Sequence, residues 1–251
     1  MSRRAPVPGV WVALAWLGCT APVQAPPANG GTPVAAPHVP VTIAPRAGAA
    51  THLVVMLHGY GADAQSFSRI SRMMTARLPT AEVLVPDGFD PFEGGAPGRQ
   101  WFSRLGNLEA DRTARVARAG ERLSAWMDGE LQRRGLGADR LVVVGFSQGA
   151  MLAGWLALHR PQRPAAVVML SGRVAEPAGA VPSRGARGKV LLLHGDADRV
   201  IPVDVVEPGA RLLEAAGLDV TRRIYPGMGH AVQEEELNEL AAFLAEATAQ
   251  P

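Results

Sequence analysis

Residues 141–158 read LVVVGFSQGAMLAGWLAL, and this stretch decides the fold class of the 251-residue chain. Its first four residues are apolar and predict a buried strand, which runs directly into Gly-Phe-Ser-Gln-Gly at residues 145–149. An almost wholly apolar helix is predicted next, over Gln148 to His159. A G-x-S-x-G sequence between a strand and a helix forms a strained turn that exposes the serine hydroxyl, and its glycines let strand and helix pack closely. Ser147 is therefore the candidate nucleophile.

Strands and helices alternate on both sides of this turn. Apolar runs predict strands at His52 to Leu57, Glu82 to Val85, Leu141 to Val144, Ala166 to Leu170, Val190 to Leu193 and Asp219 to Tyr225. Helices are expected over Ala64 to Leu78, Leu108 to Arg134, Gln148 to His159, Val203 to Ala216 and Ala231 to Ala247, with Pro208 breaking or kinking the fourth. The alternation predicts an α/β protein with a mostly parallel central sheet and helices on both faces. Together with the serine turn, it indicates the α/β-hydrolase fold.

A serine nucleophile needs a base within hydrogen-bond reach and an acid that orients the base. In this fold the order along the chain is serine, acid, histidine. His230 ends the glycine-rich sequence Pro-Gly-Met-Gly-His after the last predicted strand, where a loop can carry an imidazole over the sheet. The acid is expected in residues 194–202, HGDADRVIP, where Asp196 and Asp198 both qualify by position. His194, in the same loop, is expected to shape it.

The negative oxygen formed on the substrate carbonyl needs two backbone N–H donors. One donor is expected from Gln148, which follows the nucleophile at the N-terminus of a helix. The other should come from the loop after an early strand. Residues 57–63, LHGYGAD, form a glycine-rich loop in that place.

The N-terminus has the pattern of an export signal. Arg3 and Arg4 precede an apolar run at residues 7–18 that is too short to span a bilayer comfortably, so residues 1–18 are predicted to direct export. The Gly-Cys pair that ends the run resembles a bacterial lipobox, so Cys19 is expected to be lipidated and to anchor the protein to a membrane.

A linker is expected after this signal. Residues 20–45 contain no Asp, Glu, Lys or Arg and many Pro and Ala residues, so 19–45 is assigned to a linker and 46–251 to the catalytic domain. Signal cleavage after Ala25, with simple secretion, is the alternative to lipidation. The expected location is outside the cytoplasm, as a lipoprotein of the bacterial cell envelope or as a periplasmic or secreted protein.

Composition argues against other classes of function. The chain is 47% hydrophobic, carries a formal charge of +2 and contains one cysteine. A single cysteine permits no intrachain disulfide and no Cys-rich metal cluster. No long basic run with interleaved aromatic residues is present, so nucleic-acid binding is not expected.

Several motifs occur in the order found in the phospholipase/carboxylesterase family of α/β-hydrolases, which includes the acyl-protein thioesterases, and the chain resembles that family. The motifs are LHGYG at 57–61, RQWF at 99–102, GFSQGA at 145–150, HGDADRVIP at 194–202 and GH at 229–230. They extend from about Leu53 to the C-terminus, so the resemblance covers the whole predicted folded part. It implies no cofactor and no metal.

The resemblance also implies roles for individual residues. It makes Asp198 the triad acid and gives Asp196 a loop role. It implies that the second oxyanion donor is the amide of Tyr60. It places the segment of Trp101 and Phe102 near the acyl pocket, and Met228 is likewise expected in the substrate pocket.

The sequence therefore predicts a serine hydrolase that cleaves small-to-medium acyl esters or thioesters through an acyl-enzyme. Its substrates would be small-molecule or lipid esters, and the sequence leaves the oligomeric state open. Family members are commonly cytosolic, so the export signal favours an alternative, an exported depolymerase or feruloyl-type esterase. A non-catalytic, anchored binding protein on the same scaffold is a third hypothesis, which the intact set of serine, aspartate and histidine argues against.

Overall fold

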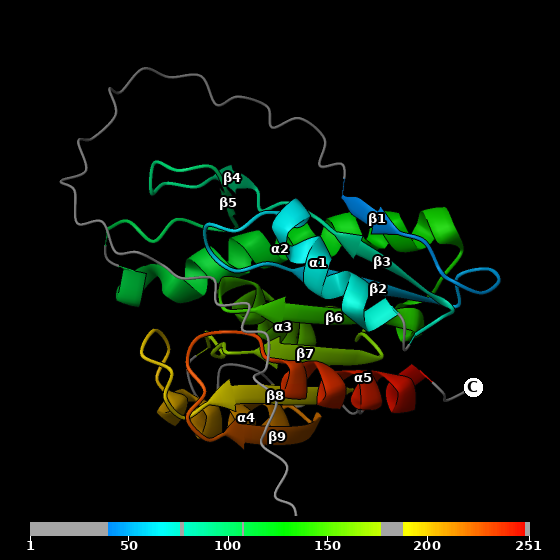
Figure 1. The fold of residues 1–251 in the computed structure, drawn as a ribbon. Coiled ribbons are helices and arrows are strands. Elements are labelled where there is room, and N and C mark those ends of the chain that lie inside the picture. Colours follow the sequence, from blue (N-terminus) through cyan, green and yellow to red (C-terminus); the bar gives the residue numbers. More distant parts are fainter. Residues whose placement is uncertain (1–39, 76–77, 107, 177–187, 249–251) are drawn as a thin grey trace, which may run out of the picture. The chain divides into compact units, whose positions relative to one another are not determined.

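A seven-stranded sheet forms the centre of the described part of the chain (Figure 1). The structure, a computed structural model, describes residues 40–75, 78–106, 108–176 and 188–248. The strand order is β1-β3-β2-β6-β7-β8-β9, and all neighbours are parallel except β1 and β3. The strands are β1 Val41–Ile43, β2 His52–Leu57, β3 Ala81–Val85, β6 Leu141–Phe146, β7 Ala166–Leu170, β8 Lys189–Gly195 and β9 Asp219–Tyr225. The predicted mostly parallel sheet is confirmed.

Helices cover both faces of this sheet (Figure 1). They are α1 Ala64–Thr75, α2 Leu108–Arg134, α3 Gln148–His159, α4 Val206–Ala215 and α5 Glu234–Thr248, with short 3₁₀ turns η1 Ala138–Arg140 and η2 Val203–Val205. Along β2 every side chain is buried, and alternate residues face opposite helices. Leu53 and Val55 join a core with α2, α3 and α4, whereas Val54 and Met56 join a second core with α1 and α5. Among the described residues, no helix combines the length and apolar character needed to cross a membrane.

The N-terminal boundary of the folded part differs from the prediction. Residues 19–45 were expected to form a linker, but Val41–Ile43 is strand β1, which pairs antiparallel with β3. Val41 and Ile43 pack against the second core. The proposed export signal, Cys19 and the linker up to residue 39 lie outside the described residues.

The stretch from Val203 to Ala216 is divided, as expected, but the division lies before Pro208 and not at it. The helix α4 begins at Val206, so Pro208 occupies its first turn. Backbone N–H groups in a first turn have no partner inside the helix, and proline therefore removes nothing there. The 3₁₀ turn η2 comes before the helix in place of its expected first residues.

A two-stranded hairpin, which the sequence did not predict, lies beside the loop after β2. It consists of β4 Asp90–Pro91 and β5 Arg99–Gln100. The amide of Arg99 donates to the carbonyl of Ala62 over 2.8 Å, and its carbonyl accepts from the amide of Gly61 over 2.9 Å. A Cβ atom at Gly98 would lie 2.2 Å from the carbonyl oxygen of Gly61, so only glycine permits this close approach.

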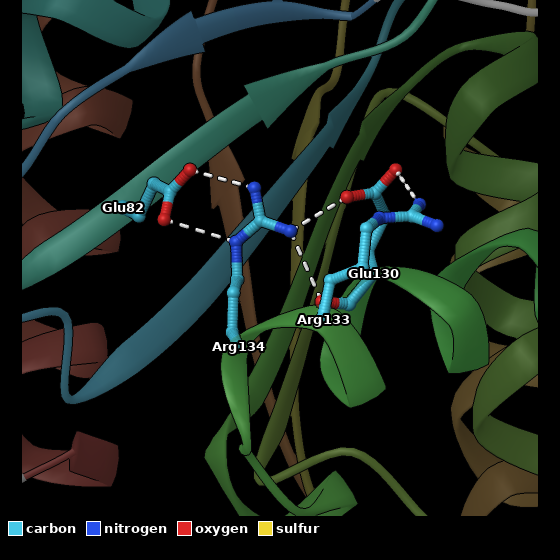
Figure 2. A network of polar contacts seen from close by, with 4 residues as sticks. All are labelled: Glu82, Glu130, Arg133 and Arg134. Atoms are coloured by element: carbon cyan, nitrogen blue, oxygen red, sulfur yellow. Dashed lines mark hydrogen bonds and ion pairs between the residues drawn. The ribbon is translucent and has the colours of Figure 1, made fainter.

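A charged network joins the C-terminal end of α2 to strand β3 (Figure 2). Arg134 donates two hydrogen bonds to the carboxylate of Glu82, over 2.7 and 2.9 Å. It also donates to the carboxylate of Glu130 over 2.6 Å, and Arg133 contacts the same carboxylate. The Arg134 side chain thus connects an element of the first core to a strand of the sheet.

Candidate active site

Ser147 lies on a strained turn between β6 and α3. Its backbone has φ 54° and ψ −112°, outside the regions that residues with side chains usually adopt. A Cβ atom at Gly145 would lie 2.2 Å from the carbonyl oxygen of Gly149, and one at Gly149 would lie 2.3 Å from that of Leu57. Both glycines of the motif are therefore required by the close approach of strand and helix.

Ser147, His230 and Asp198 form one continuous chain of hydrogen bonds. The Nε2 atom of His230 is 2.9 Å from Oγ of Ser147, and its Nδ1 atom is 2.7 Å from Oδ2 of Asp198. The other carboxylate oxygen of Asp198 accepts from the amides of Val200 and Ile201, over 2.8 and 2.9 Å. The Asp198 side chain is fully buried, so these bonds fix the carboxylate that orients the imidazole.

Asp196 and His194 hold the loops around this chain. Asp196 is exposed and accepts a hydrogen bond of 2.6 Å from the amide of Gly227, so it ties the acid loop to the histidine loop. His194 is buried, and its Nε2 atom lies 2.8 Å from the carbonyl of Ile201 and 3.5 Å from Oδ2 of Asp198. The carboxylate that contacts His230 is thus Asp198 and not Asp196.

Two backbone amides near the nucleophile are candidates for binding an oxyanion. Gln148 is the first residue of α3, where an N–H group has no acceptor inside the helix. A Cβ atom at Gly59 would lie 3.4 Å from Cβ of Ser147, so the loop that continues into Tyr60 runs against the nucleophile. The next two amides, of Gly61 and Ala62, donate to backbone carbonyls, whereas that of Tyr60 has no backbone acceptor in the described chain.

The side chain of Gln148 has a role that the sequence analysis missed. Its Oε1 accepts from the amide of Trp101 over 2.8 Å, and its Nε2 donates to the carbonyl of Phe102 over 2.7 Å. The indole of Trp101 in turn donates to the carbonyl of His58 over 2.9 Å. Gln148 therefore supports the loop that carries Tyr60. The only signal in the sequence was an amide side chain in an otherwise apolar helix.

His58 is buried and holds the same loop as a neutral ring. Burial lowers the pKa of His58, so its neutral form is favoured. The Nε2 atom then accepts from the amide of Gly88 over 2.9 Å, and the Nδ1 atom donates to the carbonyl of Gly59 over 2.8 Å.

The three residues expected in the substrate pocket are all buried. Trp101 and Met228 are 2% exposed and Phe102 is 6% exposed. Trp101 packs against the rings of His58 and Phe89 as a support of the loop. Their contact with a substrate stays a prediction.

The fold and the family comparison together define the class of protein. Residues 39–248 match the phospholipase/carboxylesterase family, and solved esterases share the fold, so the protein is an α/β-hydrolase. The chain belongs to the phospholipase/carboxylesterase family. The predicted family and fold are both confirmed.

Two relatives and two solved structures illustrate the similarity. Esterase YpfH of Escherichia coli (strain K12) is 30% identical over 193 residues, which cover 75% of this chain and 79% of that protein. A probable carboxylesterase of Oryza sativa subsp. japonica is 30% identical over 200 residues, covering 73% and 83%. The crystal structure of esterase PE8 has a TM-score of 0.77 and 30% identity, covering 84% of this chain and 99% of that one. The Bacillus cereus carboxylesterase has a TM-score of 0.70 at 20% identity, covering 84% and 95%, and so shares the fold. The family identifies this protein as a hydrolase of ester bonds.

Proposed function

We propose that the protein is a serine carboxylesterase that cleaves small-to-medium acyl esters or thioesters through an acyl-enzyme. The observation that carries this proposal is the chain of hydrogen bonds from Ser147 through His230 to Asp198. Oγ of Ser147 attacks the carbonyl carbon while Nε2 of His230 takes its proton. The buried carboxylate of Asp198 stabilises the imidazolium that forms.

The negative oxygen of the tetrahedral intermediate is bound by the amides of Gln148 and Tyr60. As the intermediate collapses, His230 returns the proton to the leaving alcohol or thiol, and the acyl group remains on Ser147. Water then attacks the acyl carbonyl, His230 takes a proton from that water, and the free acid leaves with Oγ of Ser147 reprotonated.

A small, mostly apolar cleft lies close to the nucleophile. The cleft lies between β7, β8 and α4 and has a volume of about 10 Å³, which is room for about one water molecule. Its lining includes Met169, Val174, Leu192 and Val206. Gly172, which also lines it, lies beside the nucleophile, because a Cβ atom there would be 3.4 Å from the carbonyl oxygen of Ser147.

Replacement of the nucleophile tests the mechanism. Ser147→Ala should lower kcat on p-nitrophenyl acetate by about 10⁴-fold or more, because the hydroxyl acts together with the base. A fluorophosphonate probe should label the parent at Ser147 and leave the variant unlabelled. If the variant hydrolyses the ester as fast as the parent, the mechanism is wrong. If the parent is neither labelled nor active, the protein is a binding protein instead.

A substrate panel tests the acyl preference and the alternative function. Short p-nitrophenyl esters, thioesters, lysophospholipids, feruloyl esters and hydroxybutyrate oligomers are compared by kcat/KM. The proposal expects the highest values for short and medium acyl esters or thioesters. Higher values for feruloyl esters or hydroxybutyrate oligomers would favour the depolymerase or feruloyl-type esterase, which the expected export also suggests.

We further propose that the enzyme works outside the cytoplasm, anchored through a lipid on Cys19. The support is the sequence pattern: two arginines, a short apolar run and a glycine before the single cysteine. Mass spectrometry of the mature N-terminus tests it. A lipidated Cys19 is expected, a chain that starts at Pro26 indicates simple secretion, and a chain that retains residues 1–18 contradicts export.

A further inference from the structure

The side chain of Tyr60 is hydrogen-bonded to Glu93, which lies in the hairpin between β4 and β5. Its hydroxyl donates to Oε1 of Glu93 over 2.7 Å, and burial together with this bond raises the pKa of Tyr60, so the proton stays on the phenol. The ring packs edge-on against Phe92, with centroids 4.9 Å apart, and the guanidinium of Arg104 lies 4.9 Å from its centroid. Glycines precede and follow Tyr60 in the chain, and the Gly59 carbonyl and the Gly61 amide are themselves hydrogen-bonded, so the Tyr60 side chain adds a further restraint to this backbone.

Glu93 is itself held in one position by several donors. Its Oε1 accepts from the amide of Arg104 over 2.6 Å as well as from Tyr60, and its Oε2 accepts from Nε2 of Gln100 over 3.0 Å. Burial opposes ionisation of Glu93, but hydrogen bonds from Ser103, Tyr60, Arg104 and Gln100 outweigh it and lower its pKa. A carboxylate with this many donors is charged and immobile at neutral pH.

The hairpin that carries Glu93 is also connected to the other oxyanion donor. Gln100 is followed by Trp101, and the amide of Trp101 donates to the side chain of Gln148 over 2.8 Å. Glu93 and Gln100 bond each other twice, each time over 3.0 Å. One network thus runs from Gln148 through the hairpin to Tyr60, the two residues whose amides bind the oxyanion in the proposed function.

We propose that Glu93 is a positioning residue of the oxyanion hole, which acts through the hydroxyl of Tyr60. The inference rests on the proposed function, in which the Tyr60 amide binds the oxyanion. Loss of the bond between the two side chains would remove one of the restraints on the Tyr60 peptide, so that its N–H would be aimed less accurately at the oxyanion. An oxyanion donor stabilises the transition state more than the substrate, so the loss should lower kcat and leave KM nearly unchanged.

The chain contains a matched control for this bond. It has two tyrosines, and the second, Tyr225, donates to Oε2 of Glu239 over the same 2.7 Å. This second pair joins β9 to α5, and its hydroxyl contacts no residue of the proposed mechanism. Tyr225→Phe therefore reports the effect of losing a tyrosine–glutamate bond in this protein without a change at the oxyanion hole.

Kinetics of Tyr60→Phe, Glu93→Gln and the double variant test the proposal on p-nitrophenyl butyrate. Each single variant should lower kcat about tenfold with KM changed less than about twofold, and the double variant should be no slower than the slower single variant. Binding of phenylboronic acid, which forms a tetrahedral adduct with a serine hydroxyl, should weaken by a similar factor. Tyr225→Phe should keep the parent kcat.

Three results would overturn the inference. The first is a parent-like kcat in both single variants. The second is a loss of kcat in Tyr225→Phe as large as that in Tyr60→Phe. The third is a double variant whose loss of kcat is the product of the losses in Tyr60→Phe and Glu93→Gln. If Glu93→Gln does not fold, Tyr60→Phe still decides, because it removes one oxygen atom only. An inactive Ser147→Ala with fully active Tyr60→Phe would reject this inference alone, whereas an active Ser147→Ala would reject the proposed function.

Discussion

The conformation of Ser147 is maintained by the residues around it. A φ of 54° in a residue with a side chain costs about 1–3 kcal/mol, so the surrounding structure must impose it. The amide of Ser147 donates to the carbonyl of Leu170 over 2.9 Å, which ties the turn to strand β7. Gly149 lets the first turn of α3 lie against the end of β2. These contacts hold the half-buried nucleophile in the strained conformation of the turn.

A methyl group at Gly149 should disrupt this arrangement. In Gly149→Ala the new Cβ would lie 2.3 Å from the carbonyl oxygen of Leu57, so strand and helix must separate. We expect a loss of about 3 kcal/mol or more in unfolding free energy and little remaining esterase activity. Gly129→Ala is the control, since its nearest neighbour would be at 3.6 Å and alanine favours a helix by about 0.5–1 kcal/mol. Urea unfolding measures both variants, and equal stabilities would contradict the prediction.

At the scale of elements, the first turn of α5 contains a glutamate that the fold buries, Glu236. The Glu236 side chain is 0% exposed, and its Oε2 accepts from the amide of Gln233 over 2.9 Å. Its Oε1 has no hydrogen-bond partner in the described residues. Burial raises the pKa of Glu236 from 4.5 to about 7. Folding therefore moves the pKa of this carboxyl group to near neutral pH, from 4.5 in the unfolded chain.

This burial makes stability depend on pH in a defined direction. Between pH 4.5 and about 7 the folded chain keeps a proton on Glu236 that the unfolded chain has lost, so unfolding free energy falls as pH rises. Glu236→Gln removes this dependence. Its stability relative to the parent should rise from pH 5 to pH 8 by on the order of 2–3 kcal/mol, as measured by urea unfolding at each pH. The exposed Glu235→Gln removes a charge that helps to raise the pKa of Glu236, so it should show a much smaller trend, and a flat difference for Glu236→Gln would contradict the prediction.

Arg134, near the C-terminal end of α2, should stabilise the fold through its bonds to Glu82 and Glu130 (Figure 2). Arg134→Ala removes its bonds to Glu82 and Glu130, whose side chains are 16% and 8% exposed, so two nearly buried carboxylates lose a partner. We expect a loss of about 2–3 kcal/mol. Arg134→Lys keeps the charge without the fork of two donors and should lose about 1 kcal/mol. Arg211→Ala, which breaks an exposed pair with Glu207, should change stability by less than about 0.5 kcal/mol. Thermal unfolding compares the three, and equal effects of Arg134→Ala and Arg211→Ala would contradict this account.

At the scale of the whole molecule, the sequence predicted the features that depend on local pattern. The central strands were predictable because they are buried on both faces and are continuously apolar, as in β2. The two-residue strands of the hairpin carry no periodicity, and β1 lies between prolines in a composition typical of linkers. An edge strand tolerates nearby proline because one side of its backbone needs no partner.

The same distinction holds for the candidate site. Ser147 and His230 could be found from the strand or loop that precedes each of them. The choice of Asp198 over Asp196 depended on the family pattern, because loop direction is not visible in composition. The contacts of Gln148 with Trp101, 47 residues apart, and of Tyr60 with Glu93, 33 residues apart, are tertiary and have no local signature.

Strand β1 belongs to the central sheet, and its removal tests what it contributes to the folded domain. A chain that starts at residue 46 lacks Val41 and Ile43, which pack on the second core, and leaves the edge of β3 unpaired. Relative to a chain that starts at residue 39, it should lose about 2–3 kcal/mol of unfolding free energy, because two partly buried apolar side chains are removed. It should also aggregate more readily, since an exposed strand edge pairs with other chains. Urea unfolding and light scattering measure the two effects, with the outward-facing Thr42→Ser in the longer chain as a control that should change neither. Equal stability of the two chains would contradict the prediction, because it would mean that β1 contributes nothing to the unfolding free energy although it pairs with β3.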